Sequence, residues 1–360
     1  MRKSKSESMG LAEPKCEIHG MGPRARILSR PIGGEPDLHA VTANEVWAAA
    51  RRIHQHLRPT PLVCSPGLSE LLGADVWLKL ETASEIACFK LRGALSALLA
   101  VDTPRTAVTS STGNHGQAVA LAARKLGLAS DIFVPESANP VKCRMIALLG
   151  GTLHVGGHDI DDAKDRARAH AAKIGGNFVD DGENRDLIAG AGTVGLEIGQ
   201  DLAHIDTVYV PMGSGSLAGG TAIGVKASQS RVRVVAVQAA GAPAMVESFH
   251  ARRAIERPIA TRADCLVCRV PAEAALATLY AGLDDALLAG DDTLLAALHT
   301  LIGRAHLLVE LGAAAPLAAA WAEREKIAGQ RVVLVMSGAN VAPSTVAEAL
   351  ALPPLGGDFA

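Results

Sequence analysis

A lysine stands at the start of an apolar, alanine-rich segment, in the stretch CFKLRGA at residues 88–94. An amine that is kept from water in such a place loses part of its preference for the charged form, from an ordinary pKa of about 10.4. The neutral amine of Lys90 could then condense with an aldehyde. The alternative is a surface lysine whose stem packs on the helix while its charge stays in water. This segment alone leaves both interpretations open.

Short polar residues follow the predicted strand TAVTS, in the stretch SSTGNHGQAVA at residues 110–120. Free backbone N–H groups at a helix start, together with the hydroxyls of Ser111 and Thr112, form a cradle for a carboxylate or a phosphate. A plain helix cap needs fewer polar groups than these two hydroxyls and Asn114. His115 is either a base or a structural residue of the helix start.

A glycine-rich turn, MGSGSLAGG at residues 212–220, follows the predicted strand DTVYVP. Glycines let the backbone approach a phosphate closely. The turn also has the spacing GxGxxxG, which is typical of dinucleotide sites. Such sites need an acidic residue at the end of the next strand, but VRVVAVQ ends in Gln238. The turn is therefore predicted to bind a single phosphate.

A fourth junction, VVLVMSGAN at residues 332–340, places Ser337 where a buried strand ends. Its hydroxyl is expected to face a cleft rather than bulk solvent. The alternative is that Ser337 only caps the next helix.

The elements that position these residues follow a regular alternation of apolar, β-branched runs and alanine-rich helical segments. Strand-like runs are DVWLKLE, TAVTS, DIFVP, TLHVG, DTVYVP, VRVVAVQ and RVVLVM. This alternation predicts parallel sheets covered by helices on both faces. The number of units predicts an α/β fold of two lobes, with a cleft at the carboxyl ends of the strands.

Four parts of the chain are predicted from this pattern. They are a flexible N-terminal extension at 1–40, a larger lobe at 41–105 plus 183–352, a smaller mobile lobe at 106–182 and a tail at 353–360. The extension is rich in Lys, Ser, Gly and Pro, and its Cys16 and His19 are better explained as part of a tail than as metal ligands. After it, VTANEVWAAARRIHQHL predicts a helix capped by Thr42.

Composition excludes several classes of function. Hydrophobic residues make up 49% of the 360 residues and aromatic residues only 3%, so the core is predicted to consist of Ala, Leu, Val and Ile. The 35 Lys and Arg against 37 Asp and Glu leave no basic excess for a nucleic acid. No apolar run suits a membrane span or a secretion signal. The scattered cysteines suit free thiols in the cytoplasm, and a metal or redox role for Cys265 and Cys268 is disfavoured.

Taken in order, the four segments resemble the fold-type-II pyridoxal-phosphate enzymes of the tryptophan synthase β-like superfamily, and among them the threonine dehydratase and serine racemase branch. The resemblance runs from about Thr60 to Val346 and includes RPTPL at 58–62 and LIAGAGTVGLEI at 187–198. It implies that pyridoxal 5′-phosphate lies in the cleft between the lobes, bound by the larger one. It also implies a homodimer that acts on a small amino acid.

The resemblance implies a role for each marked residue. Lys90 carries the cofactor as a Schiff base, and Lys90 and Thr112 act in catalysis. The cofactor is bound by Lys90, Phe89, Asn114, Gly213, Ser214, Gly215, Ser216, Leu217, Glu310 and Ser337. The substrate is bound by Ser111, Thr112, Gly113 and His115. Within this set, Asn114 bonds the 3-hydroxyl of the cofactor, Ser337 faces the pyridine nitrogen and Glu310 lies near the ring.

The implied neutral hydroxyl at the pyridine nitrogen does not enforce a pyridinium, so the cofactor is a weaker electron sink. A long-lived carbanion is then poorly stabilised, and prompt loss of a β-leaving group is favoured. The resemblance therefore predicts an ammonia-lyase, or dehydratase, that converts a β-hydroxy amino acid of the threonine or serine type to a 2-oxo acid and ammonia. Lys90 is expected to take the α-proton.

Some positions depart from the family pattern. Cys88 stands where a serine often precedes Phe-Lys, and GSGS replaces an all-glycine phosphate loop. Thr112 stands where racemases carry a serine and dehydratases often an alanine, so a racemase side activity stays open. Gln238 and Ala244 replace the Glu and Asp of metal-binding racemases, so no metal is predicted. No regulatory domain is expected after Leu350, which favours a catabolic role.

Alternatives within the fold are an amino-acid racemase of the serine racemase type, or a lyase for 3-hydroxyaspartate, a phenylserine or a hydroxyectoine-derived compound. A β-replacement synthase is less favoured, because its asparagine loop usually has Thr where His115 stands. From other classes, a nicotinamide dehydrogenase is disfavoured by Gln238. An inactive scaffold is disfavoured because Lys90, Asn114 and Ser337 occur together.

Overall fold

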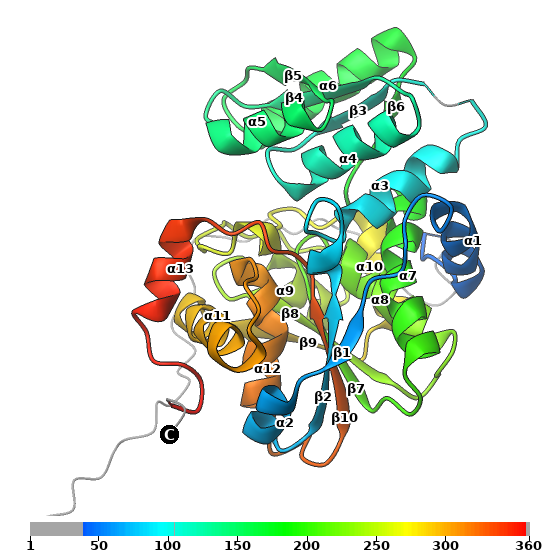
Figure 1. The fold of residues 1–360 in the computed structure, drawn as a ribbon. Helices are drawn as coiled ribbons and strands as arrows, with labels where there is room; N and C mark the ends of the chain where they lie inside the picture. The colour runs from blue at the N-terminus through cyan, green and yellow to red at the C-terminus, as the bar shows by residue number, and fades with distance from the viewer. Residues whose placement is uncertain (1–38, 104, 358–360) are drawn as a thin grey trace, which may run out of the picture.

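The computed structural model describes residues 39–103 and 105–357, which form two sheets with helices packed against them (Figure 1). A six-stranded sheet has the order β1-β2-β10-β7-β8-β9, and a four-stranded sheet has the order β5-β4-β3-β6. Neighbouring strands are parallel except β1, which is antiparallel to β2. The strands are β1 (Leu62–Cys64), β2 (Asp75–Leu80), β3 (Ala107–Ser110), β4 (Ser130–Val134), β5 (Thr152–Val155), β6 (Asn177–Phe178), β7 (Thr207–Pro211), β8 (Arg233–Ala239), β9 (Asp285–Ala289) and β10 (Arg331–Met336).

Helices connect most of these strands, as parallel pairing requires. The α-helices are α1 (Ala43–Ile53), α2 (Pro66–Leu72), α3 (Lys90–Leu99), α4 (Asn114–Lys125), α5 (Pro140–Leu148), α6 (Ile160–Ile174), α7 (Arg185–Asp201), α8 (Ser216–Lys226), α9 (Ala244–Ala251), α10 (Glu273–Gly282), α11 (Asp291–Ala305), α12 (Ala315–Ala322) and α13 (Pro343–Leu350). Three short 3-10 helices are η1 (Glu81–Ala83), η2 (Asp264–Leu266) and η3 (Leu311–Ala314). We call the four-stranded sheet with α4, α5 and α6 the small lobe, and the six-stranded sheet with its helices the large lobe (Figure 1).

Both faces of the six-stranded sheet are buried. Successive residues of β8 fall into two different apolar clusters, with Val234 on the side of α8 and Val235 on the side of α12. Side chains alternate across a strand, so this division means that each face packs against helices. The central strands therefore need apolar residues on both sides, which explains why they are continuous apolar runs in the sequence.

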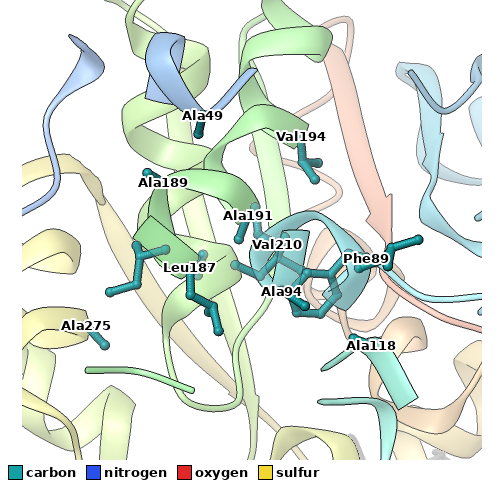
Figure 2. Packing of buried hydrophobic residues seen from close by; sticks show 14 of the residues in the cluster. Ala49, Phe89, Ala94, Ala118, Leu187, Ala189, Ala191, Val194, Val210 and Ala275 are labelled. Atoms are coloured by element: carbon teal, nitrogen blue, oxygen red, sulfur yellow. The ribbon is translucent and has the colours of Figure 1, made fainter. Parts of the chain in front are cut away.

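The core around α3 is built from small side chains. Figure 2 shows Ala49 of α1, Ala94 of α3 and Ala191 of α7 among the side chains of this core, with Phe89 to one side. Small residues also let α7 and α8 touch closely, since a Cβ on Gly195 would lie 2.1 Å from the carbonyl oxygen of Thr221. This close packing fixes α8, whose first residues belong to the predicted phosphate turn.

The α/β fold class is confirmed, and most predicted strands and helices are present. Thr42 caps α1, and Glu45 completes a capping box. The helix ends at Ile53, before the predicted end at Leu57, because the N–H groups of His56 and Leu57 both bond the carbonyl of Ile53 and close a turn. Strands β1, β6 and β9 were not predicted, since two of them are very short and none follows a clear alternation.

The predicted extension at 1–40, with Cys16 and His19, lies almost wholly outside the described residues, as does the end of the tail. The predicted domain boundaries and the mobility of the small lobe remain predictions. In the part of the chain that the structure describes, no helix combines the length and the apolar character that crossing a membrane requires.

Candidate active site

The segment before Lys90 is held against the end of β10. Cys88 forms an isolated antiparallel bridge with Gly338, and the N–H of Phe89 donates to the carbonyl of Ser337 at 3.0 Å. The hydroxyl of Ser84 accepts from the N–H of Cys88 at 2.8 Å and donates to its carbonyl at 2.7 Å. Together these bonds bring Lys90, at the start of α3, next to Ser337 from the far end of the chain.

The Lys90 side chain is 15% exposed and forms an ion pair with Asp181, which follows β6. Its Nζ also lies 4.9 Å from the centroid of the Phe89 ring. The apolar segment around Lys90 gives no sign of this partner, because the carboxylate comes from a distant part of the chain. Asp181 was missed by the sequence analysis, although two consecutive aspartates at a strand end are a signal that could have found it.

Asp181 links the lysine to the predicted phosphate turn. Its second oxygen accepts a hydrogen bond of 3.1 Å from the hydroxyl of Ser216. Burial would raise the pKa of Asp181, but the Lys90 ammonium and the hydrogen bond from Ser216 hold that pKa well below its usual range. Asp181 is therefore ionised at neutral pH.

The turn Gly213–Leu217 leads directly into α8. Gly215 has φ +96°, a left-handed conformation that favours glycine, and no side chain caps the helix there. A Cβ on Gly213 would lie 2.8 Å from the carbonyl oxygen of Cys265. The hydroxyls of Ser214 and Ser216 lie 3.3 Å apart, and Ser216 and Leu217 are buried. A glycine turn with uncapped N–H groups at a helix start is suited to a phosphate.

The predicted substrate residues precede or open α4. The N–H of Gly113 donates to the hydroxyl of Ser111 at 3.2 Å, and Thr112 is half-buried beside them. Asn114 reaches across to the large lobe, where its Nδ2 donates to Glu310 at 2.9 and 3.2 Å. Asn340, which the sequence analysis also missed, donates to Asn114 Oδ1 at 2.8 Å.

His115 is buried in α4, with Nε2 lying 3.1 Å from the carbonyl oxygen of Val179. Only an N–H can bond a carbonyl, so the proton lies on Nε2 and Nδ1 carries a lone pair. Burial lowers the pKa of His115, which keeps the ring neutral. Its Nδ1 is buried without a protein partner. A neutral ring with a free acceptor thus lies next to Asn114.

Glu310 is 5% exposed and lies against the end of β10, where its N–H donates to the carbonyl of Gly338 at 2.9 Å. Burial raises the pKa of Glu310 to about 7, against a lowering effect of Asn114. The carboxyl group is consequently divided between its charged and neutral forms near neutral pH.

Gln238 occupies a position at which metal-binding relatives were expected to carry a carboxylate. Its Oε1 accepts from the N–H groups of Met245 and Val246 at 3.1 Å each, so it binds the first turn of α9. The side chain is fully buried in this structural role.

The structure thus brings several predicted site residues together in two groups. Lys90 and Ser216 are linked through Asp181, and Asn114 is hydrogen-bonded to Glu310. The pairing of segments 88–89 and 337–338 joins them. Two hollows on the protein surface lie elsewhere, beside Pro66 and beside His250, and no predicted site residue lines either.

Comparison with known proteins agrees with this geometry. The family model described as pyridoxal-phosphate dependent enzyme matches residues 53–338. The chain is 32% identical over 307 residues to an L-threonine ammonia-lyase of Geobacter sulfurreducens, a match that covers 84% of this chain and 76% of that protein. The solved structure of processed threonine deaminase isoform 2 from Solanum lycopersicum has a TM-score of 0.82 and 26% identity, with 91% of each chain covered. Maize serine racemase has a TM-score of 0.80 and 26% identity, with 87% of this chain and 97% of that one covered. This chain belongs to the family of pyridoxal-phosphate dependent enzymes.

Proposed function

We propose that this enzyme is an ammonia-lyase that converts a β-hydroxy amino acid of the threonine or serine type to a 2-oxo acid and ammonia. The observation that carries the proposal is the contact chain from Lys90 through Asp181 to Ser216. Through these contacts the Lys90 amine lies close to the glycine turn that contains Ser216, and one molecule with an aldehyde and a phosphate could contact both. The similarity to an L-threonine ammonia-lyase supports the choice of reaction.

The residues present fit pyridoxal phosphate. The turn Gly213–Ser216 offers helix-start N–H groups and two hydroxyls to the phosphate, and a side chain at Gly213 would collide with the backbone at Cys265. Leu217 lies in the first turn of the same helix. Lys90 offers the amine, Phe89 an apolar surface beside it and Asn114 an amide. In this proposal Ser337 faces the pyridine nitrogen and Glu310 lies near the ring.

When bound, pyridoxal phosphate supplies an aldehyde for the amine and a ring that withdraws electrons from the substrate α-carbon. Lys90 would hold the cofactor through its Nζ, and the same Nζ would take the α-proton of the substrate. Asp181, beside that Nζ, stabilises the ammonium that results. The overall change removes water across the α- and β-carbons, and hydrolysis then releases the amino nitrogen as ammonia.

The substrate carboxylate is proposed to bind at the start of α4. Ser111, Thr112 and Gly113 supply hydroxyls and N–H groups there, and the helix start favours a negative charge. His115 stays neutral, so it contributes a fixed hydrogen-bonding ring rather than a charge. Thr112 also has a hydroxyl that could carry a proton.

That hydroxyl gives the second candidate function, racemisation. A racemase needs a proton donor on the side of the α-carbon opposite Lys90, and Thr112 belongs to the small lobe whereas Lys90 opens α3. The likeness to maize serine racemase supports this candidate. Thr112→Ala would separate the two activities, because elimination requires Lys90 while racemisation requires both residues.

The test is an assay of 2-oxo acid and ammonia after reconstitution with pyridoxal phosphate. The panel contains L- and D-threonine, L- and D-serine, threo- and erythro-3-hydroxyaspartate and phenylserine. We expect equimolar 2-oxo acid and ammonia from at least one compound, and a loss of about 10²- to 10⁴-fold in Lys90→Ala. Lys326→Ala is the matched control, since Lys326 is exposed and forms an ion pair with Glu323, just after α12. No product from any compound would contradict the proposal, and interconversion of enantiomers alone would favour the racemase.

A homodimer, a cytoplasmic location and independence from magnesium or calcium remain parts of the proposal. The structural use of Gln238 supports the last of these. Activity that survives excess chelator is expected, and activity that is lost and then restored by magnesium would overturn it. Sedimentation of the purified protein would test the dimer.

A further inference from the structure

Three possible metal ligands meet on the small lobe, outside the proposed active site. They are Asp131 of β4, His154 of β5 and His170 of α6. Nε2 of His154 lies 2.8 Å from Asp131 Oδ1, and Nε2 of His170 lies 3.0 Å from Oδ2. Among the described residues this is the group of His, Cys, Asp and Glu whose ligand atoms all lie within 4.8 Å of one another.

The fold holds these side chains in place. Phe133 and His154 are paired across β4 and β5, and their rings stack at 4.5 Å with an angle of 10° between their planes. Asp131 lies two residues before Phe133, so both project from the same face of the sheet. Helix α6 covers this face through a row of alanines and brings the ring of His170 to 5.3 Å from that of His154. The arrangement therefore depends on three elements rather than on one flexible loop.

The surroundings suit a bound ion. The side chains of Asp131, His154 and His170 are 19%, 33% and 28% exposed, so the group is neither in bulk solvent nor sealed from it. Strand β5 lies at the edge of its sheet, and the partial exposure of the three side chains lets water reach them. As metal ligands, two imidazoles and one carboxylate would present a single negative charge to a cation.

The group formed by Asp131, His154 and His170 is separate from the proposed active site. The active-site residues of this lobe, 111–115, follow the carboxyl end of β3, whereas Asp131 lies near the start of β4. Helix α4 carries Asn114 and His115, but the metal ligands lie on the face that α6 covers. The prediction of no metal rests on Gln238 and Ala244 and does not concern this group. Asp131, His154 and His170 give no signal in the sequence, because they are separated by 23 residues and then by 16, which matches no short motif.

We propose that Asp131, His154 and His170 bind a divalent transition metal of the zinc class. Two imidazole nitrogens and one carboxylate oxygen are ligands that such ions prefer, with water completing the coordination. Metal–ligand lengths of about 2.0–2.1 Å place tetrahedral ligands about 3.3 Å apart, so the Nε2–carboxylate distances of 2.8 and 3.0 Å need to lengthen by only about half an ångström or less. Each imidazole moves its proton to Nδ1 and turns a lone pair at Nε2 toward the ion. The ion joins β4, β5 and α6 and takes no part in elimination.

The test is a competition titration of the full-length protein with Zn²⁺ against a chromogenic chelator, after removal of adventitious metal. Wild type is expected to bind one equivalent, and His170→Gln and Asp131→Asn are expected to bind it more than about 100-fold more weakly. His158→Gln is the matched control, because His158 is exposed on the same lobe and lies outside the group. Variants that bind zinc as wild type does, or a wild type that binds none, would overturn the proposal.

A second measurement needs no variant and so does not depend on how a variant folds. Diethylpyrocarbonate modification of wild type, mapped by mass spectrometry, is expected to fall several-fold at His154 and His170 when Zn²⁺ is added, and to be unchanged at His158. Equal modification with and without Zn²⁺ would overturn the site. Neither experiment uses enzyme activity, so the result is independent of the proposed function.

Discussion

Arg92 and Lys90 lie two residues apart in α3, and their surroundings differ sharply. Arg92 is fully buried, and all of its side-chain nitrogens are hydrogen-bonded. Glu81 accepts from it at 2.7 and 3.0 Å and Glu197 at 2.5 and 2.7 Å. Lys90, in the proposed active site, has a single carboxylate partner and keeps partial contact with solvent.

The buried network balances its own charge. Lys79 donates to Glu197 at 2.6 Å and to the carbonyl of Thr60 at 2.7 Å, so two cations face two carboxylates. Burial would lower the pKa of Arg92, but Glu81 and Glu197 raise it. Such a network has no group left to take up a proton or a ligand, and it fixes the direction of α3.

By comparison, groups of the proposed active site are not fully paired within the protein. His115 has a buried Nδ1 without a protein partner, and the pKa of Glu310 is raised to about 7. The difference teaches that burial of charge does not by itself mark an active site. Charges whose hydrogen bonds and ion pairs are complete within the protein support the helix. Groups whose hydrogen bonding is only partly complete lie where a ligand is proposed to bind.

The largest expected effect is the loss of stability when the buried network around Arg92 is broken. Arg92→Met leaves the buried Glu81 without its cation and Glu197 with Lys79 alone, and should lower the free energy of unfolding by about 3–5 kcal/mol. Urea unfolding measures it. The control Arg331→Met breaks the half-exposed pair with Asp75 and should cost less than about 1 kcal/mol. Equal losses in the two variants would remove the distinction between the two cations.

Next in size is the pH dependence that Glu310 gives to the protein without cofactor. Its pKa is about 7 in the folded protein and 4.5 ordinarily, so between these values the folded protein keeps a proton that the unfolded chain releases. The free energy of unfolding should therefore fall as pH rises from about 4.5 to about 7, by up to about 3 kcal/mol from this group. Glu310→Gln should remove this fall. Identical pH profiles of stability for wild type and variant would show that Glu310 does not titrate there.

A smaller loss of stability is expected from a change at Gly338, which lies against Glu310. Gly338→Ala would place a Cβ 2.3 Å from Glu310 Oε1, so Glu310 must move and its bond with Asn114 must weaken. We expect a loss of about 1–3 kcal/mol in unfolding free energy. Gly303→Ala, with open space around its Cβ, is the control and should not destabilise. A Gly338→Ala protein as stable as this control would mean that Glu310 is held less firmly than its contacts indicate.

The smallest effect on stability is expected where function is proposed. The double variant Lys90→Met with Asp181→Asn removes both charges of the cleft pair and should change the free energy of unfolding by less than about 1 kcal/mol. Thermal and urea unfolding would measure this. A loss as large as that of Arg92→Met would mean that the pair of Lys90 and Asp181 mainly stabilises the fold.

Local sequence pattern predicted much of this arrangement. The junctions after β3, β7 and β10 were found from short polar and glycine residues at strand ends, because parallel strands place their carboxyl ends at one edge. Asp181 was missed, since it lies 91 residues from Lys90 and only the fold brings them together. The network around Arg92 was missed for the same reason, as Glu81 and Glu197 come from separate elements. Glu310 was placed only through the family resemblance.

The most direct test of the central claim is to find which lysine reacts with the cofactor. The protein is incubated with pyridoxal phosphate, reduced with borohydride and digested, and the phosphopyridoxyl label is located by mass spectrometry. The label is expected on Lys90, with none on the fully buried Lys79 and no visible absorption band in Lys90→Ala. A label spread over surface lysines, with none on Lys90, would contradict the account.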